Sequence, residues 1–270
     1  MARETRGPWI VSHLSEHDAR SVVVVDRLPP GQCHLWLVPV RRRPGWLDLL
    51  DPEEREQFER RSGSAAADVL VTSRAVQRLV GARYLGVPPA EVAIDRDCAH
   101  CERPGVRHGR PRFRNSDIDY SVSHTAAWVL MAITRTGLVG VDIEDLASAP
   151  EPHGMAEAVL TPAERERFDR LAPSAAAQWL VSAWTRKEAA MKLSGLGLAA
   201  PPTRLDVSGP TVSATALPRW PDATMHLCAI PAPDNHVAAL ATTEPGLELR
   251  RFTLPQLTAE PMSHHEAIFL

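Results

Sequence analysis

The sequence predicts an α+β protein made of two similar halves related by a pseudo-twofold axis. The first observation behind this is an internal repeat, because residues 50–71 and 160–181 are identical at 13 of 22 positions, 110 residues apart. The second is that strand-like segments surround the two copies without alternating one for one with helices. This arrangement favours α+β over a doubly wound parallel sheet.

Each copy of the repeat predicts a short helix followed by a long one. In both copies a Pro stands near the first helical position, after an Asp or a Thr that can act as N-cap. Thr161 and Glu164 have the spacing of a capping box. The second helix is expected to begin at Ser64 or Ser174, and the long helix of the first copy to end near Gly86.

The expected strands are short runs of apolar and β-branched residues bounded by turn residues. The turn at Thr136–Gly137 predicts a hairpin between two of them, and we divide the chain there into halves of residues 1–136 and 137–270. A further strand is expected to end in the segment 120–125. The other strands are expected at residues 22–26, 33–40, 128–134, 138–146, 224–230, 236–242 and 247–254.

The composition excludes several classes of protein. A formal net charge of −3 argues against general electrostatic binding to nucleic acid. No apolar run has the length of a membrane helix, and the N-terminal residues do not open a signal peptide, so a cytoplasmic protein with no membrane partner is expected. Four cysteines are too few for a disulfide framework, and the lone Cys98–Cys101 pair is expected to lie in a plain loop.

Three acidic residues predict a metal site. Asp142 and Glu144 alternate with apolar residues and therefore share one face of a strand, roughly 7 Å apart along it. Glu188 falls within the apolar stripe of the long helix, where an unpaired charge is costly. A single Mg²⁺ would satisfy all three carboxylates. The alternatives are a solvated acidic strand face, and an ion pair of Glu188 with Lys192 or Arg78.

Groups that can bind phosphate accompany these acids. Lys192 follows Glu188 by one helical turn, and we expect Lys187 to flank the same face. A Gly-Arg-Pro turn at residues 109–111 can approach a ligand closely, and Ser123 and His124 offer a hydroxyl and an imidazole.

These residues form a pattern that resembles the 4′-phosphopantetheinyl transferases. The pattern is Gly140-x-Asp142, then Trp184 forty-two residues after the Asp, followed by Lys187, Glu188 and Lys192. The segments SVSH, HGRP and GLGL also look like motifs of this family. Length and duplication resemble the larger, Sfp-type branch, in which two halves of one chain enclose the active site in the cleft between them.

The resemblance implies a reaction and roles for the residues. Coenzyme A, as co-substrate, would donate its phosphopantetheine arm to a serine of an apo acyl or peptidyl carrier protein of polyketide, peptide or fatty-acid synthesis. Asp142, Glu144 and Glu188 would hold Mg²⁺, or Mn²⁺ in its place. Lys192 would grip the pyrophosphate. Glu188 is the first choice as catalytic base and Glu164 the second, although Glu164 has the alternative of a helix-capping acid.

The resemblance also assigns the nucleotide and carrier sides of the site to the two halves. The N-terminal half would bind the adenine and 3′-phosphate, and the C-terminal half the metal and the carrier. The basic residues usual in the first helical pair are replaced here by Glu54 and Gln57, with Arg55, Arg60, Arg61 or Arg74 as substitutes. The residues expected to bind coenzyme A are Arg55, Arg60, His108, Gly109, Arg110, Pro111, Ser123, His124, Lys187 and Lys192.

The carrier is expected to dock on residues 147–165, where Met155, Val159 and Leu160 are apolar, with Arg165 and Arg167 attracting its acidic surface. The enzyme is expected to be a monomer. Two other functions are alternatives: a non-catalytic module that binds coenzyme A or a carrier protein, and an unrelated metal-dependent phosphohydrolase.

Overall fold

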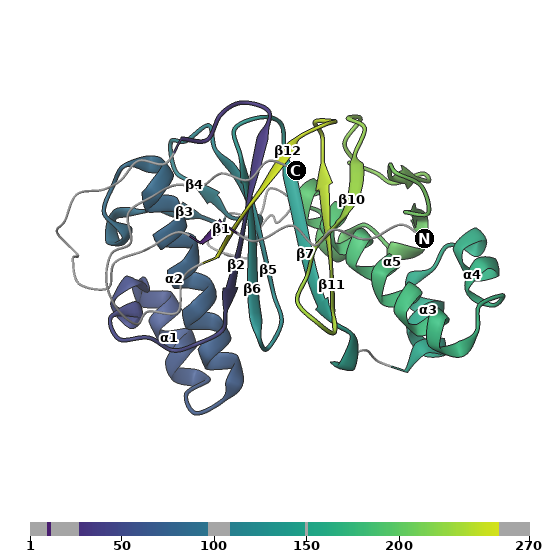
Figure 1. Ribbon diagram of the computed structural model, residues 1–270, viewed down its shortest axis with the longest axis horizontal. Coiled ribbons are helices and arrows are strands. Elements are labelled where there is room, and N and C mark those ends of the chain that lie inside the picture. The colour runs from purple at the N-terminus through teal and green to yellow at the C-terminus, as the bar shows by residue number, and fades with distance from the viewer. Residues whose placement is uncertain (1–9, 12–26, 97–108, 149–150, 254–270) are drawn as a thin grey trace.

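The computed structural model describes residues 10–11, 27–96, 109–148 and 151–253 and has a mixed α+β fold. Two sheets lie side by side in the middle of the molecule, with α1 and α2 outside one sheet and α3, α4 and α5 outside the other (Figure 1). The α+β class expected from the sequence is therefore confirmed. None of the helices in these described ranges combines the length and apolarity needed to cross a bilayer.

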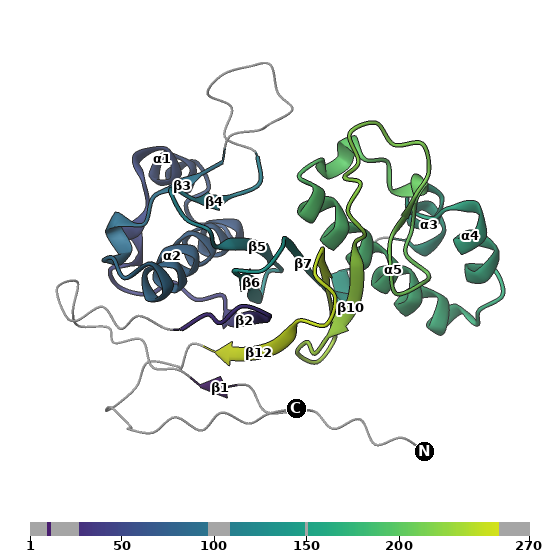
Figure 2. The same cartoon turned by 90° about the horizontal axis from the view of Figure 1, so that it is seen from above.

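The larger sheet has five strands in the order β1-β12-β2-β6-β5, and the smaller has three in the order β10-β11-β7. Figure 2 shows β12, from the C-terminal end of the described chain, lying between β1 and β2. The strands of these two sheets are β1 (Ile10–Val11), β2 (Gln32–Pro39), β5 (Asp119–His124), β6 (Trp128–Thr134), β7 (Val139–Asp145), β10 (His226–Ile230), β11 (His236–Thr242) and β12 (Glu248–Thr253). Two small ribbons pair β3 (Ile94–Asp95) with β4 (Arg112–Phe113) and β8 (Leu205–Asp206) with β9 (Ser213–Ala214).

Most of the expected strands are present within a few residues of their predicted bounds, and residues 22–26 lie outside the described ranges. The hairpin expected at Thr136–Gly137 is wrong. The strands on either side of this turn belong to different sheets, because β6 pairs with β2 and β5, whereas β7 pairs with β11. Gly137 has φ 69°, so the turn is tight, but it leads the chain from one sheet to the other.

The helices follow the repeat. Asp51 caps α1 and Thr161 caps α4, each in a capping box with a glutamate three residues later, as expected for the second copy. Both long helices end at a glycine in the left-handed region, Gly86 and Gly195. The helices are α1 (Pro52–Arg60), α2 (Ala65–Leu85), α3 (Pro152–Val159), α4 (Pro162–Phe168) and α5 (Pro173–Ser194), with 3₁₀ turns η1 (Trp46–Leu49), η2 (Pro89–Glu91), η3 (Leu146–Ser148), η4 (Gly197–Ala199) and η5 (Pro202–Arg204).

Three apolar clusters hold these layers together, between α2 and the larger sheet, between the two sheets, and between α5 and the smaller sheet. Strand β7 contributes one of its two faces to the cluster between the sheets. Val139, Val141 and Ile143 are buried between the sheets, which leaves Asp142 and Glu144 on the face toward α5.

Gly140 allows β7 and α5 to lie in close contact. A Cβ atom on Gly140 would be 2.0 Å from the carbonyl oxygen of Ala189 and 2.7 Å from the amide nitrogen of Leu193. Any larger residue would therefore collide with the backbone of α5. The glycine of the strand motif brings the acids of β7 next to the helix that carries Glu188 and Lys192.

Candidate active site

Side chains of β5 join the two sheets at the edge of β7. Although β5 and β7 belong to different sheets, the Val139 amide donates to Asp119 Oδ2 at 2.8 Å, and the Val141 amide donates to Ser121 Oγ at 3.0 Å. Ser123, two residues further along β5, donates to Asp142 Oδ1 at 2.7 Å. Asp119 and Ser121 are site residues that were not expected, although the alternation of polar residues at 119, 121 and 123 marks this face of β5.

Asp142 is buried at the centre of this contact. Its Oδ1 accepts from Ser123 and from Lys192 Nζ, the latter at 2.5 Å, and Lys192 also donates to Ser123 Oγ at 2.8 Å. Its Oδ2 is buried and has no hydrogen-bond partner in the described part of the chain. A buried carboxylate oxygen without a donor is unfavourable unless a cation or another donor satisfies it.

Burial and the charges of Asp142 and Lys192 affect both of the other acids, Glu144 and Glu188. Burial, followed by the charge of Asp142, raises the pKa of Glu144, and a hydrogen bond from Trp184 Nε1 at 2.9 Å opposes this shift. Burial also raises the pKa of Glu188; Lys192 lowers it, while Asp142 and Glu144 raise it further. The fold thus brings three carboxylates and one ammonium group together.

This donor set fits a divalent cation chemically. Three carboxylates, one with an unsatisfied buried oxygen, are the ligands that Mg²⁺ or Mn²⁺ prefers. Within the ranges that the structure describes, no three His, Cys, Asp or Glu side chains are already arranged to hold a metal ion. Lys192 and Trp184 each bind an oxygen of one of these acids, so the metal assignment of Asp142, Glu144 and Glu188 stays a prediction.

His124 lies at the exposed end of β5, directly after Ser123. Partial burial of its ring and the nearby charge of Lys192 lower its pKa. The imidazole is therefore largely neutral at pH 7 and can donate one hydrogen bond to an anionic oxygen.

The charged residue buried on α5 is Lys187 rather than Glu188. Lys187 is 0% exposed, and its ammonium group donates to Glu164 and to the carbonyl oxygens of Val159 and Pro202. Glu188 is half-buried at the margin of the helix face. The expectation that Lys187 flanks the Lys192 face is wrong, because a rotation of about 100° per residue directs it toward α4. These three acceptors use all the donors of an ammonium group.

Glu164 has the capping role that was its alternative in the sequence. Its Oε2 accepts from the Thr161 amide and from Lys187, and its Oε1 accepts from the Val207 amide at 2.9 Å. Glu164 is buried, and both of its oxygens are used in holding α4 against α5 and the residue after β8. These contacts leave Glu188 as the more accessible of the two candidate bases.

On the predicted adenine side, Arg110 is also engaged within the protein. Its guanidinium donates to both oxygens of Asp119, at 2.7 and 2.5 Å, and to the Val139 carbonyl. This buried pair extends the contact between β5 and β7. Gly109 and Pro111 are half-buried beside it, and His108 lies outside the described residues.

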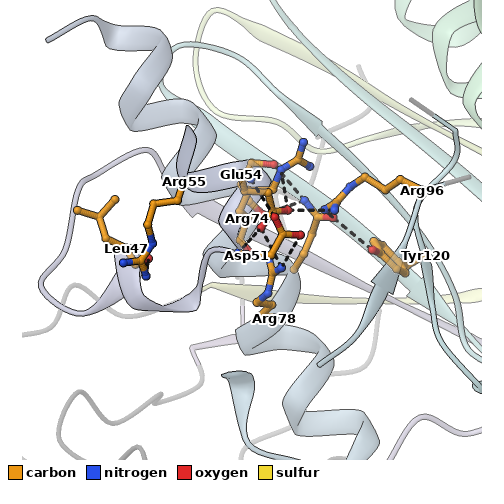
Figure 3. Close-up of polar contacts among 10 residues, drawn as sticks. Leu47, Asp51, Glu54, Arg55, Arg74, Arg78, Arg96 and Tyr120 are labelled. Carbon is orange, nitrogen blue, oxygen red and sulfur yellow. Dashed lines mark hydrogen bonds and ion pairs between the residues drawn. The ribbon is translucent and has the colours of Figure 1, made fainter. Parts of the chain in front are cut away.

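Three arginines surround Glu54 of α1: two come from α2, and the third follows β3 (Figure 3). Glu54 is buried between Arg78 at 2.8 Å, Arg96 at 2.9 Å and Arg74 at 3.2 Å. Desolvation and the neighbouring Arg96 lower the pKa of Arg74 to about 10.

Of the four arginines expected as candidates for the nucleotide phosphate, Arg74 lies in this cluster, whereas Arg55, Arg60 and Arg61 lie outside it. Arg55 is exposed and donates to the Leu47 carbonyl at 2.9 Å, and Arg60 is exposed beside Glu56. Their assignment to the 3′-phosphate stays a prediction.

A pocket of about 390 Å³ opens next to Glu144. Strand β7 contributes acidic residues to its wall, and helices α3 and α5 contribute apolar ones. Its lining residues are Glu144, Asp145, Ser148, Met155, Val159, Val181 and Trp184. Two of the three apolar residues predicted to meet the carrier, Met155 and Val159, thus face a hollow beside the acids.

Comparison with known proteins shows similarity to one enzyme family. Residues 138–241 match the sequence model of the 4′-phosphopantetheinyl transferase superfamily. The chain is 27% identical over 176 residues to the 4′-phosphopantetheinyl transferase HetI of Nostoc sp. (strain PCC 7120), and the alignment covers 62% of this chain and 70% of the relative. It is 26% identical over 173 residues to the putative 4′-phosphopantetheinyl transferase slr0495 of Synechocystis sp. (strain PCC 6803), covering 62% and 66%. The matched region contains the strand and helix that form the cluster around Asp142, so the similarity to the 4′-phosphopantetheinyl transferase superfamily extends over the candidate site.

Proposed function

We propose that this chain transfers the 4′-phosphopantetheine arm of coenzyme A to a serine hydroxyl of an apo carrier protein, with release of 3′,5′-ADP. The observation that carries the proposal is the convergence of Asp142 and Glu144 from β7 with Glu188 and Lys192 from α5. The alternative of a non-catalytic binding module is not favoured by the relatives, both of which bear the name of the enzyme.

In the reaction, the serine oxygen forms a bond to the β-phosphorus of coenzyme A while the bond from that phosphorus to the bridging oxygen breaks. The serine proton passes to a base, for which Glu188 is our candidate. Its carboxylate is half-buried and more accessible than that of Glu164, which is buried and engaged at both oxygens.

Lys192 and His124 are candidates for binding the phosphates. The ammonium group of Lys192 is partly exposed and can turn from Asp142 toward a pyrophosphate oxygen. His124, neutral and exposed, can donate to a second phosphate. Asp142, Glu144 and Glu188 would hold Mg²⁺, which when bound neutralises charge on the pyrophosphate.

We further propose that the chain belongs to the two-half, Sfp-type branch. The matching capping boxes of α1 and α4, each followed by a long helix that ends at a left-handed glycine, support a duplicated half. On this view the carriers are those of polyketide, peptide or fatty-acid synthesis, the enzyme acts as a cytoplasmic monomer, and the carrier docks beside α3 near the pocket.

The test is a transfer assay with coenzyme A, Mg²⁺ and an apo carrier protein, read as the gain in mass of the carrier. Asp142→Asn and Glu188→Gln should each lower the turnover number by about 10²–10³-fold, the usual effect of removing one electrostatic group from a transition state. Asp117→Asn is the matched control, since Asp117 is an exposed aspartate paired with Arg135 at the surface. No gain of mass with any of a panel of apo carriers would refute the proposed reaction.

A further inference from the structure

One contact near the acids is not used by the proposed reaction. Trp184 Nε1 donates to Glu144 Oε1 at 2.9 Å. An indole has a single hydrogen-bond donor, and here that donor is used on a half-buried carboxylate rather than on solvent or backbone. A hydrogen bond to an ionised group is stronger than one between neutral groups, and it restricts the carboxylate to one orientation.

The rest of the indole is fixed by packing. Trp184 contacts two apolar clusters, one between α5 and the smaller sheet and the other around Met191 and Leu205. It also forms part of the wall of the pocket beside Glu144. Packing thus fixes the ring that bears the N–H donor. Trp184 lies on α5, one helical turn before Glu188.

The internal repeat shows that this contact is specific to the second copy. The position equivalent to Trp184 in the first copy is Arg74, and the position equivalent to Glu188 is Arg78. In the first copy both side chains contact the capping acid Glu54. In the second copy, Lys187 forms the ion pair with the capping acid Glu164. Trp184 instead contacts Glu144 on the neighbouring strand β7.

We propose that Trp184 is a positioning residue that holds one oxygen of Glu144 in place, so that the other oxygen is presented to a divalent cation. This inference rests on the proposed function, because it assumes that Glu144 binds the cation. Hydrogen bonds to the ligands of a metal fix ligand orientation, and their loss typically weakens metal binding by about 10–100-fold.

The test is Mn²⁺ binding to the full chain, measured by electron paramagnetic resonance of free Mn²⁺. Trp184→Phe keeps the aromatic ring and removes the N–H, and it should weaken binding by about 10–100-fold. Trp179→Phe is the matched control: Trp179 lies on the same helix and contacts Arg167 instead, so its replacement should leave the affinity unchanged. In the transfer assay, Trp184→Phe should raise the Mg²⁺ concentration needed for the half-maximal rate.

A double-mutant cycle with Glu144→Gln separates positioning from packing. If Trp184 acts through Glu144, adding Trp184→Phe to Glu144→Gln should not weaken Mn²⁺ binding further, whereas a packing effect would be the same in both backgrounds. Thermal unfolding in the chelator EDTA verifies that each variant is folded. An unchanged Mn²⁺ affinity in folded Trp184→Phe would overturn the positioning role of Trp184 alone. If Trp184→Phe does not fold, a wild-type Mn²⁺ affinity in Glu144→Gln would overturn this role instead. A wild-type chain that binds no Mn²⁺ would overturn the metal site and this inference with it, while a normal metal affinity without transfer would contradict only the proposed reaction.

Discussion

Replacement of Gly140 by alanine tests how closely β7 and α5 must approach. In most strands Gly→Ala is favourable by about 0.5–1 kcal/mol, because glycine loses more backbone entropy on folding. Here the new Cβ would lie 2.0 Å from the Ala189 carbonyl oxygen and 2.7 Å from the Leu193 amide nitrogen. Carbon and oxygen atoms that are not bonded rarely approach within about 3 Å, so strand and helix must separate by about 1 Å.

This separation has an energetic and a catalytic consequence. Overpacking of a core costs about 1–3 kcal/mol, and we expect the upper end of this range because the clashing atoms belong to a helix backbone that cannot change rotamer. The displacement also separates Asp142 from Glu188 and Lys192. A misplacement of about 1 Å in an active site can lower a rate by about 10²-fold.

The free energy of unfolding is measured by urea titration and the rate by the initial gain in mass of an apo carrier. Gly209→Ala is the control, because the nearest atom to its added Cβ is 4.0 Å away, and both quantities should stay near the wild-type values. If Gly140→Ala were as stable and as active as Gly209→Ala, the argument that this glycine sets the spacing of the site would be refuted.

Three further predictions concern charge. Lys187→Met leaves a buried carboxylate without its cation and should reduce the free energy of unfolding by about 3–5 kcal/mol in urea titration; a loss below about 1 kcal/mol would contradict the buried pair. Because the pKa values of Glu144 and Glu188 are raised, ionising them costs stability as the pH rises, and a bound cation offsets this cost. The increase in Tm produced by Mg²⁺ should therefore be larger at pH 8 than at pH 5.5, and an increase independent of pH would argue against binding at these acids. Replacing both Arg165 and Arg167 by serine should slow association with an acidic carrier more at low salt than at high salt in stopped-flow measurements; an equal effect at both would argue against steering.

The local features of the fold could be predicted from the sequence because they depend on neighbouring residues. The capping box at Thr161, the left-handed end of α2 at Gly86 and the alternation of apolar and acidic residues in β7 are set by interactions within a few residues. The repeat predicted the paired helices, and the spacing from Asp142 to the motif that begins at Trp184 indicated the resemblance to the family. These patterns sufficed for most of the elements and for choosing Asp142, Glu188 and Lys192 as candidates, but they did not indicate Asp119 and Ser121.

The tertiary structure decided which partner each of these residues meets. Two strands joined by a tight turn at Gly137 could have formed a hairpin, but β7 pairs with β11 instead, and its apolar face is buried between the two sheets. Lys187 and Lys192 are both lysines of one helical motif, and only the packing of α4 makes the first a buried structural cation and leaves the second near Asp142. Burial and hydrogen-bond partners depend on contacts between segments distant in the chain, which sequence periodicity does not specify.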